Sequence, residues 1–115
     1  MKTVEVKLTT IELRKLTGNN TDEGKFADTC DLITTTLDII PQGGFTPKDI
    51  RDRNRIQFVI DEYRKDKKKP EIKDIHKLKF EDADYDNLKS IVNNSRWVSR
   101  DKALQEFIDS FNIKE

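Results

Sequence analysis

The beginning of the chain alternates between apolar and polar positions. Val4, Val6 and Leu8 are separated by charged residues, and a second short apolar run follows them. A period of two with β-branched residues is typical of strands that bury one face. We therefore predict a β-rich N-terminus over residues 1–16, with one or two short strands. Residues 11–14 are also compatible with the opening of a helical turn.

Four later segments repeat apolar residues at intervals of three and four, the spacing that places side chains on one face of a helix. They predict helices over residues 25–40, 46–65, 82–93 and 99–112. The second begins with an N-cap pattern, Thr46 followed by Pro47, and Ser99 is the expected N-cap of the last. The predicted inward-facing residues of the four helices are, in order, Phe26, Cys30, Ile33, Leu37 and Ile40; Ile50, Ile56, Val59, Ile60 and Tyr63; Tyr85, Leu88, Ile91 and Val92; and Ala103, Leu104, Phe107, Ile108 and Phe111.

The segments between these helices complete the predicted fold. Residues 17–24 are rich in Gly and Asn and predict a loop. Leu78 and Phe80 alternate with lysines, which indicates a short strand that pairs with the N-terminal one. The predicted fold class is α+β, a single domain over residues 1–115. It is mostly helical, with about four helices and a small antiparallel sheet of two or three short strands.

Composition narrows the classes of function. Of the 115 residues, 34% are hydrophobic and 38% are charged, so the chain can bury one modest core, and a large enzyme with a deep apolar pocket is disfavoured. The net charge is +0, with 22 basic and 22 acidic residues, which disfavours a globally basic nucleic-acid binder. The sequence has no apolar run of membrane-spanning length and no signal-peptide core, so we expect a cytoplasmic protein that does not bind membranes.

Candidate catalytic and metal-binding groups are few. Asp82, Asp84 and Asp86 resemble the start of a calcium loop, but the Gly and Glu positions of that pattern hold Asn87 and Asn93. An acidic first turn that favours the helix dipole explains these residues better.

The other candidate groups are Cys30 and His76. The chain's one cysteine, Cys30, is expected to be a small buried hydrophobe, and its one histidine, His76, is expected to be solvated. Phosphate-binding and hydrolase motifs are missing from the sequence. We therefore predict no catalytic residue, no metal and no cofactor.

Residues 48–69 are the basic part of the chain. They contain nine basic residues against five acidic ones, a local charge of +4. A solvated helix face with ion pairs explains this pattern, and a protein-binding edge or a nucleic-acid surface are the alternatives. Trp97 follows the third predicted helix between Arg96 and Arg100. It is expected either to cover the junction of two helices or to anchor an interface.

The order of these features resembles that of small proteins encoded by tailed bacteriophages. The matching residues, within 25–112, are Pro41, Gly43, Gly44, Phe45, Thr46, Asp49, Ile50, Arg51 and Arg53; Phe80, Glu81, Asp82, Ala83, Asp84 and Leu88; Trp97; and Phe107, Ile108 and Asp109. The resemblance implies a phage origin, a location in the host cytoplasm and a binding role without catalysis. It carries over no catalytic residue.

Together these observations predict a non-enzymatic protein–protein interaction module. Its partner would be a virion component, in particle assembly, or a host protein that it blocks, such as a defence component. The predicted partner-binding residues are Arg51, Arg53 and Arg55, with Arg96, Trp97 and Arg100 second. One alternative is a nucleic-acid-binding regulator with a helix-turn-helix over 25–65 and the basic 48–69 helix. The other is a metal-dependent enzyme that uses the acidic cluster and His76.

Overall fold

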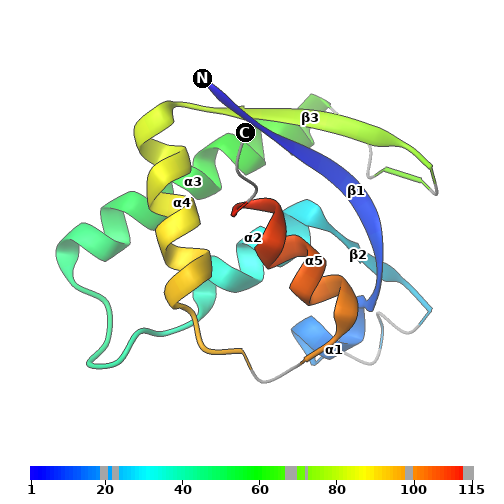
Figure 1. Ribbon diagram of the computed structural model, residues 1–115, viewed down its shortest axis with the longest axis horizontal. Helices are drawn as coiled ribbons and strands as arrows, with labels where there is room; N and C mark the ends of the chain where they lie inside the picture. Colours follow the sequence, from blue (N-terminus) through cyan, green and yellow to red (C-terminus); the bar gives the residue numbers. More distant parts are fainter. Residues whose placement is uncertain (19–20, 22–23, 67–69, 72, 98–99, 113–115) are drawn as a thin grey trace.

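The computed structural model describes residues 1–18, 21, 24–66, 70–71, 73–97 and 100–112. In these ranges the chain forms five helices and one three-stranded antiparallel sheet, which confirms the predicted α+β class. The elements are β1 (Lys2–Glu12), α1 (Leu13–Thr17), β2 (Phe26–Asp28), α2 (Thr29–Asp38), α3 (Pro47–Asp66), β3 (Ile75–Phe80), α4 (Asp82–Asn94) and α5 (Lys102–Ser110) (Figure 1).

The sheet has the strand order β2-β1-β3, with β1 in the centre and both pairings antiparallel. Val4 lies opposite Leu78, and Lys2 lies opposite Phe80. The predicted pairing between the Leu78–Phe80 segment and the N-terminal strand is therefore confirmed. Val4, Leu78 and Phe80 are buried, as the alternation of the two segments requires.

Strand β1 changes its pairing register between Leu8 and Glu12. Val4 and Val6 are buried at even positions, whereas Ile11 is buried at an odd one, because the irregularity reverses which residues face the core. Threonine hydroxyls bond to backbone groups beside this irregularity. Thr9 donates to the carbonyl of Ala27 at 2.7 Å, and Thr29 accepts from the amide of Lys7 at 3.1 Å.

Two predicted elements in the first part of the chain differ from the structure. The second apolar run does not form another strand: Leu13–Thr17 is the short helix α1, the alternative that the sequence left open, and it ends at Gly18 with φ 71°. The predicted helix over 25–40 is wrong at both ends. Its first residues form β2, and it stops at Asp38.

The start of α2 is fixed by a reciprocal capping box. The Asp28 carboxylate accepts from the amide of Asp31, and the Asp31 carboxylate accepts from the amide of Asp28, both at 2.9 Å. The cap begins the helix at Thr29, after Phe26, and the helix ends at Asp38, before Ile40; both of these side chains are exposed. Their predicted place on the buried face is therefore wrong.

The other three helices lie close to their predicted ranges. Helix α3 extends to Asp66, but Ile50, predicted to face inward, is exposed. Lys67, Lys68 and Lys69, the end of the predicted basic helix, lie outside the described residues, as does Ser99. The last helix starts at Lys102 instead, where Asp101 is the N-cap and accepts from the amide of Ala103 at 2.9 Å.

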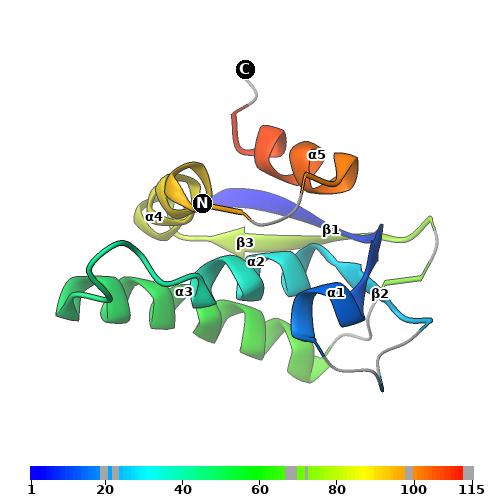
Figure 2. The same ribbon diagram turned by 90° about the horizontal axis from the view of Figure 1, so that it is seen from below.

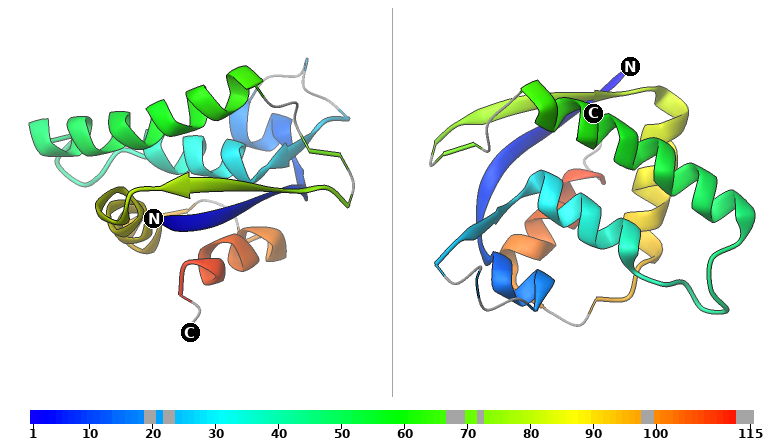
Figure 3. Two further views of the ribbon diagram at one scale, coloured as in Figure 1. Left: turned by 90° about the horizontal axis from the view of Figure 1, so that it is seen from above. Right: turned by 180° about the vertical axis from the view of Figure 1, so that it is seen from behind.

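One buried cluster joins the strands and the longer helices. It contains Val4, Val6, Ile11, Cys30, Leu32, Ile33, Leu37, Ile56, Ile60, Leu78, Phe80, Leu88, Val92, Leu104, Phe107 and Phe111. Figure 2 shows α2 and α3 on one side of the strands and α5 on the other. In the left view of Figure 3, helix α3 lies outside α2, on the side of the sheet away from α5. It is also the longest helix among the described residues, and many of its side chains are exposed.

Candidate protein-interaction surface

Helix α3 starts with the N-cap that the sequence predicts. Thr46 Oγ1 accepts from the amide of Asp49 at 3.1 Å, and the Asp49 carboxylate accepts from the amide of Thr46 at 2.9 Å. This backbone bond from Thr46 is the main reason that the pKa of Asp49 is lowered. The cap and Pro47 fix where the helix begins, and so fix which residues face outward.

The inner face of α3 is narrow. Ile56 and Ile60 are fully buried, and Val59 and Tyr63 pack against the core at its edge. Phe58 is two residues from both Ile56 and Ile60, which places it roughly 160° around the helix from each. It is therefore at the centre of the outward face, and 64% of its surface is exposed.

Arg51 and Arg55 flank Phe58 on the outward face. Arg51 is exposed and forms no ion pair with any other described residue. Arg55 directs its Nε to the buried carboxylate of Asp84 at 3.2 Å, while its side chain stays 64% exposed. The terminal nitrogens of Arg55 therefore keep donors for an external acceptor.

Arg53 forms contacts within the protein that the sequence did not predict. It is half-buried, and its Nη1 donates to the carbonyls of Leu37 at 2.8 Å and Thr36 at 3.3 Å, at the end of α2. Its guanidinium also lies over the ring of Phe45, 5.0 Å from the centroid. Arg53 therefore joins the start of α3 to the negative end of α2, and it is half-buried rather than fully exposed, while its predicted contact with a partner stays a prediction.

The three residues of the second predicted contact group differ in how far they are buried. Arg96 and Arg100 are exposed, whereas Trp97 is half-buried and packs against the core. Within the described chain, the buried indole Nε1 of Trp97 has no hydrogen-bond partner. This packing agrees with the interpretation of Trp97 as a cover over the helix junction.

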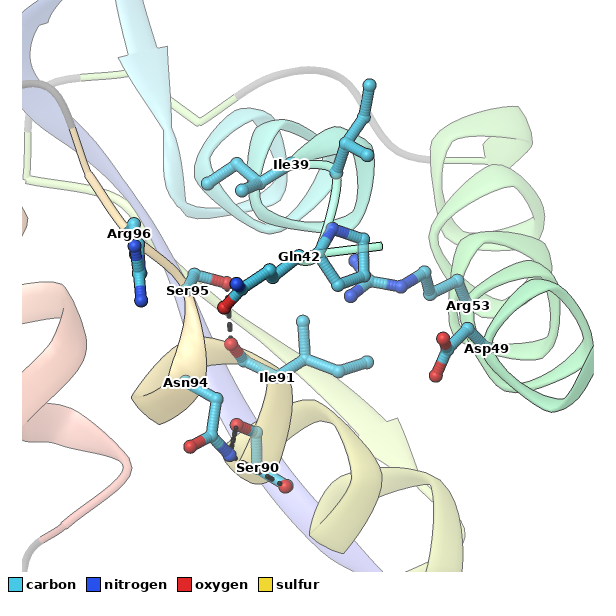
Figure 4. A pocket seen from close by; sticks show the side chains of 11 residues that line it. Ile39, Gln42, Asp49, Arg53, Ser90, Ile91, Asn94, Ser95 and Arg96 are labelled. Carbon is cyan, nitrogen blue, oxygen red and sulfur yellow. Dashed lines mark hydrogen bonds between the residues drawn. The ribbon is translucent and has the colours of Figure 1, made fainter. Parts of the chain in front are cut away.

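The chain also forms a cleft of about 640 Å³ between the loop after α2, the start of α3 and the end of α4 (Figure 4). Several of its polar groups are used internally. Ser95 donates to the carbonyl of Ile91 at 2.6 Å, Asn94 donates to the carbonyl of Ser90 at 2.8 Å, and Asp49 is held by Thr46. The bonds that these groups make serve to end or cap helices.

The remaining titratable residues near the core form structural contacts. Nη2 of Arg64 lies 3.0 Å from carboxylate oxygens of both Asp28 and Asp31. Burial raises the pKa of Asp28, and it raises the pKa of Cys30 to about 12, so the thiol carries its proton at neutral pH.

His76 is half-buried rather than solvated, a correction to the prediction. Its Nδ1 lies 2.6 Å from the hydroxyl of Tyr63. Burial raises the pKa of Tyr63, so its phenol keeps the proton, and the tautomer of His76 determines which of the two groups donates. His76 is therefore part of a packing contact between α3 and β3.

The described residues include no group of three or more His, Cys, Asp or Glu side chains placed to hold a metal ion. None of their helices has both the length and the apolar character that a membrane crossing requires.

Comparisons of the chain with protein-family models, with curated proteins and with solved structures found no match.

Proposed function

We propose that this chain is a non-enzymatic protein-interaction module whose contact surface is the outward face of α3, defined by Arg51, Asn54, Arg55, Phe58, Asp61 and Glu62. The exposed Phe58 at its centre carries the proposal. Aromatic and arginine side chains are enriched in the centres of protein interfaces, and here both types are adjacent on one rigid helix.

The mixed charge of this face favours a protein partner over a nucleic acid. Arg51 and Arg55 precede Phe58, but Asp61 and Glu62 follow it on the same face. A phosphate backbone that followed the helix would meet the two carboxylates, which repel it. A protein surface can present charges of both signs and match this pattern.

The side chains that could take part in catalysis are buried or bonded to other residues of the protein, which supports a role without catalysis. Cys30 is buried with its proton in place, and His76 is bonded to Tyr63. The carboxylates of Asp28 and Asp84 are each paired with an arginine. A catalytic group must instead reach a substrate atom.

The phage origin implied by the sequence resemblance remains part of this proposal, with a virion component or a blocked host protein as the partner. The neighbours of the gene in its genome test it. Adjacent virion genes support assembly, and adjacent early genes support the blocking of a host protein. A location among housekeeping genes of a cellular chromosome contradicts both.

Site-specific photo-crosslinking tests the contact surface. A photoreactive phenylalanine analogue replaces Phe58 in one variant and Ile75 in another, because Ile75 is also an exposed apolar residue, at 58%, but lies on β3. We expect a protein adduct in cell extract from position 58 and none from position 75. Adducts of equal yield from both positions, or adducts with nucleic acid, contradict the proposal.

A further inference from the structure

The charges next to Phe58 on the outward face of α3 differ in sign on its two sides, although a further cation, Lys65, follows the acidic pair. Arg51, Asn54 and Arg55 are in the two turns before it and carry hydrogen-bond donors, whereas Asp61 and Glu62 are in the turn after it and carry acceptors. A surface whose two halves complement each other about a central point can bind a copy of itself through a two-fold axis. From this pattern we infer that the partner of the surface is a second copy of this chain, packed with the two α3 helices antiparallel. The inference rests on the proposed function in its assembly form, in which the virion component bound by this surface is another copy of the chain.

The register of such a pair follows from the helix geometry. When the two-fold axis passes beside Phe58, a residue a given number of positions before Phe58 lies level with the residue the same number of positions after it in the other copy. The two Phe58 rings then meet at the centre. Arg55 lies level with Asp61 of the second copy, and Asn54 lies level with its Glu62.

The positions around the helix bring specific pairs to the same side. At 100° per residue, Arg51, Arg55 and Glu62 are all displaced from Phe58 in one direction, and Asn54 and Asp61 are displaced in the other. The carboxylate of Glu62 therefore faces Arg51 and Arg55 of the second copy. The carboxylate of Asp61 faces the amide of Asn54 of the second copy. Two-fold symmetry forms each of these contacts twice.

The side chains involved are available for these contacts. The side chain of Glu62 is 47% exposed, and its one ion pair in the described chain is with Lys65, at 2.7 Å. Lys65 lies level with Arg51 of the second copy, and both cations then share the carboxylate of Glu62, which limits their repulsion. Asp61 accepts from Gln57 at 2.9 Å and keeps lone pairs for Asn54.

The association state of the purified full chain tests the inference. Sedimentation velocity over a wide concentration range is expected to show a monomer–dimer equilibrium. Phe58→Ser should weaken the dimer at least about tenfold, because the central aromatic contact is lost. Ile75→Ser is the matched control, and its dissociation constant should equal that of the wild type. Thermal unfolding by circular dichroism checks that each variant keeps its fold.

A charge swap identifies the antiparallel register. Arg51→Glu and Glu62→Arg should each weaken the dimer by about tenfold, since each places like charges across the interface. The double variant restores opposite charges between positions 51 and 62 but leaves Arg55 facing a cation, so it should recover part of the loss and dimerise more tightly than either single variant. These two residues suit the swap because Arg51 has no ion pair in the described chain and Glu62 has only a surface one.

Three results overturn the inference: a monomer at all concentrations, a dimer indifferent to Phe58→Ser, or a double variant as weak as the single ones. The crosslinking experiment distinguishes a failure of this inference from a failure of the proposed function. A chain that is monomeric in solution but forms an adduct with another protein through position 58 contradicts the self-association and keeps the interaction module. A chain that neither dimerises nor forms a protein adduct through position 58 contradicts both the self-association and the interaction module.

Discussion

Arg64 connects the end of α3 to the start of α2, and replacing it with Met tests how much that connection stabilises the fold. Its Nη2 lies 3.0 Å from the carboxylate oxygens of both Asp28 and Asp31. The side chain of Asp28 is almost fully buried, so the guanidinium is its compensating charge. Met keeps most of the aliphatic stem and removes only the charged end of the side chain.

The expected loss of stability in Arg64→Met follows from how deeply Arg64 and Asp28 are buried. Removing one partner of a fully buried ion pair costs about 3–5 kcal/mol. Arg64 is 37% exposed, so water weakens the pair, and Asp28 keeps its bond from the amide of Asp31. We therefore expect Arg64→Met to lower the free energy of unfolding by about 2 kcal/mol at pH 7. Urea unfolding followed by circular dichroism measures this loss, with an unchanged slope against denaturant as the check on two-state behaviour.

The free energy of unfolding lost in Arg64→Met should depend on pH in a defined direction. The folded pKa of Asp28 is raised, mainly by burial, so the folded protein binds this proton more tightly than the unfolded chain does. Arg64 opposes that rise, and its removal raises the pKa of Asp28 further. The penalty in Arg64→Met is therefore full above the raised pKa and shrinks as the pH falls through it, because a protonated Asp28 needs no cation.

Asp28→Asn provides the matched background, since Asn also serves as an N-cap and carries no charge. Arg64→Met should cost about 1 kcal/mol less in that background, and its cost there should change less between acidic and neutral pH, because only the contact of Arg64 with Asp31 remains. The reasoning is refuted if Arg64→Met costs the same in both backgrounds, or less than about 0.5 kcal/mol in the wild type.

Three further predictions concern the caps, the thiol and the core. Thr46→Ala should lower the free energy of unfolding by about 1 kcal/mol in urea, whereas Thr46→Ser keeps the capping hydroxyl and should cost a few tenths; equal losses contradict the capping role. Native Cys30 should react with a soluble maleimide at least about a thousandfold more slowly than the urea-unfolded chain, because burial shields the sulfur and raises its pKa to about 12 from the ordinary 9.0; fast native labelling contradicts this. Leu88→Ala should cost about 3 kcal/mol, while Lys89→Ala on the outer face of α4 should change stability by less than about 0.5 kcal/mol; similar losses would mean that the core is wrongly assigned.

The parts of the fold that were predicted well are those with local determinants. Thr46, Pro47 and Asp49 lie within four residues of one another, and they mark the start of α3 in the sequence as they do in the structure. The 25–40 helix failed because Phe26 has helical spacing to Cys30 although it precedes the cap. The recurrence of Asp at positions 28 and 31 is a local sign of the true boundary, since the two carboxylates form the capping box.

The candidate site was harder to predict because it depends on which face of α3 is covered. Arg53 is among other charged residues in the sequence and was expected to be exposed, but its partners are carbonyls on α2 more than fifteen positions earlier. Arg64 meets Asp28 across a separation of 36 positions, which no local pattern encodes. Phe58 was not singled out from the sequence. A helical projection of residues 46–65 would have placed it opposite Ile56 and Ile60.

The central position of β1 in the sheet has a consequence for how the protein is made. During synthesis this strand leaves the ribosome long before β3, with which it pairs from Lys2 to Lys7. At about 5–20 residues per second, on the order of several seconds pass before Leu78 is available to Val4. Throughout that interval the edge of β1 that later pairs with β3 is a template for any neighbouring nascent chain. Lys2, Glu5 and Lys7, charges spaced along the strand, discourage such pairing until β3 arrives.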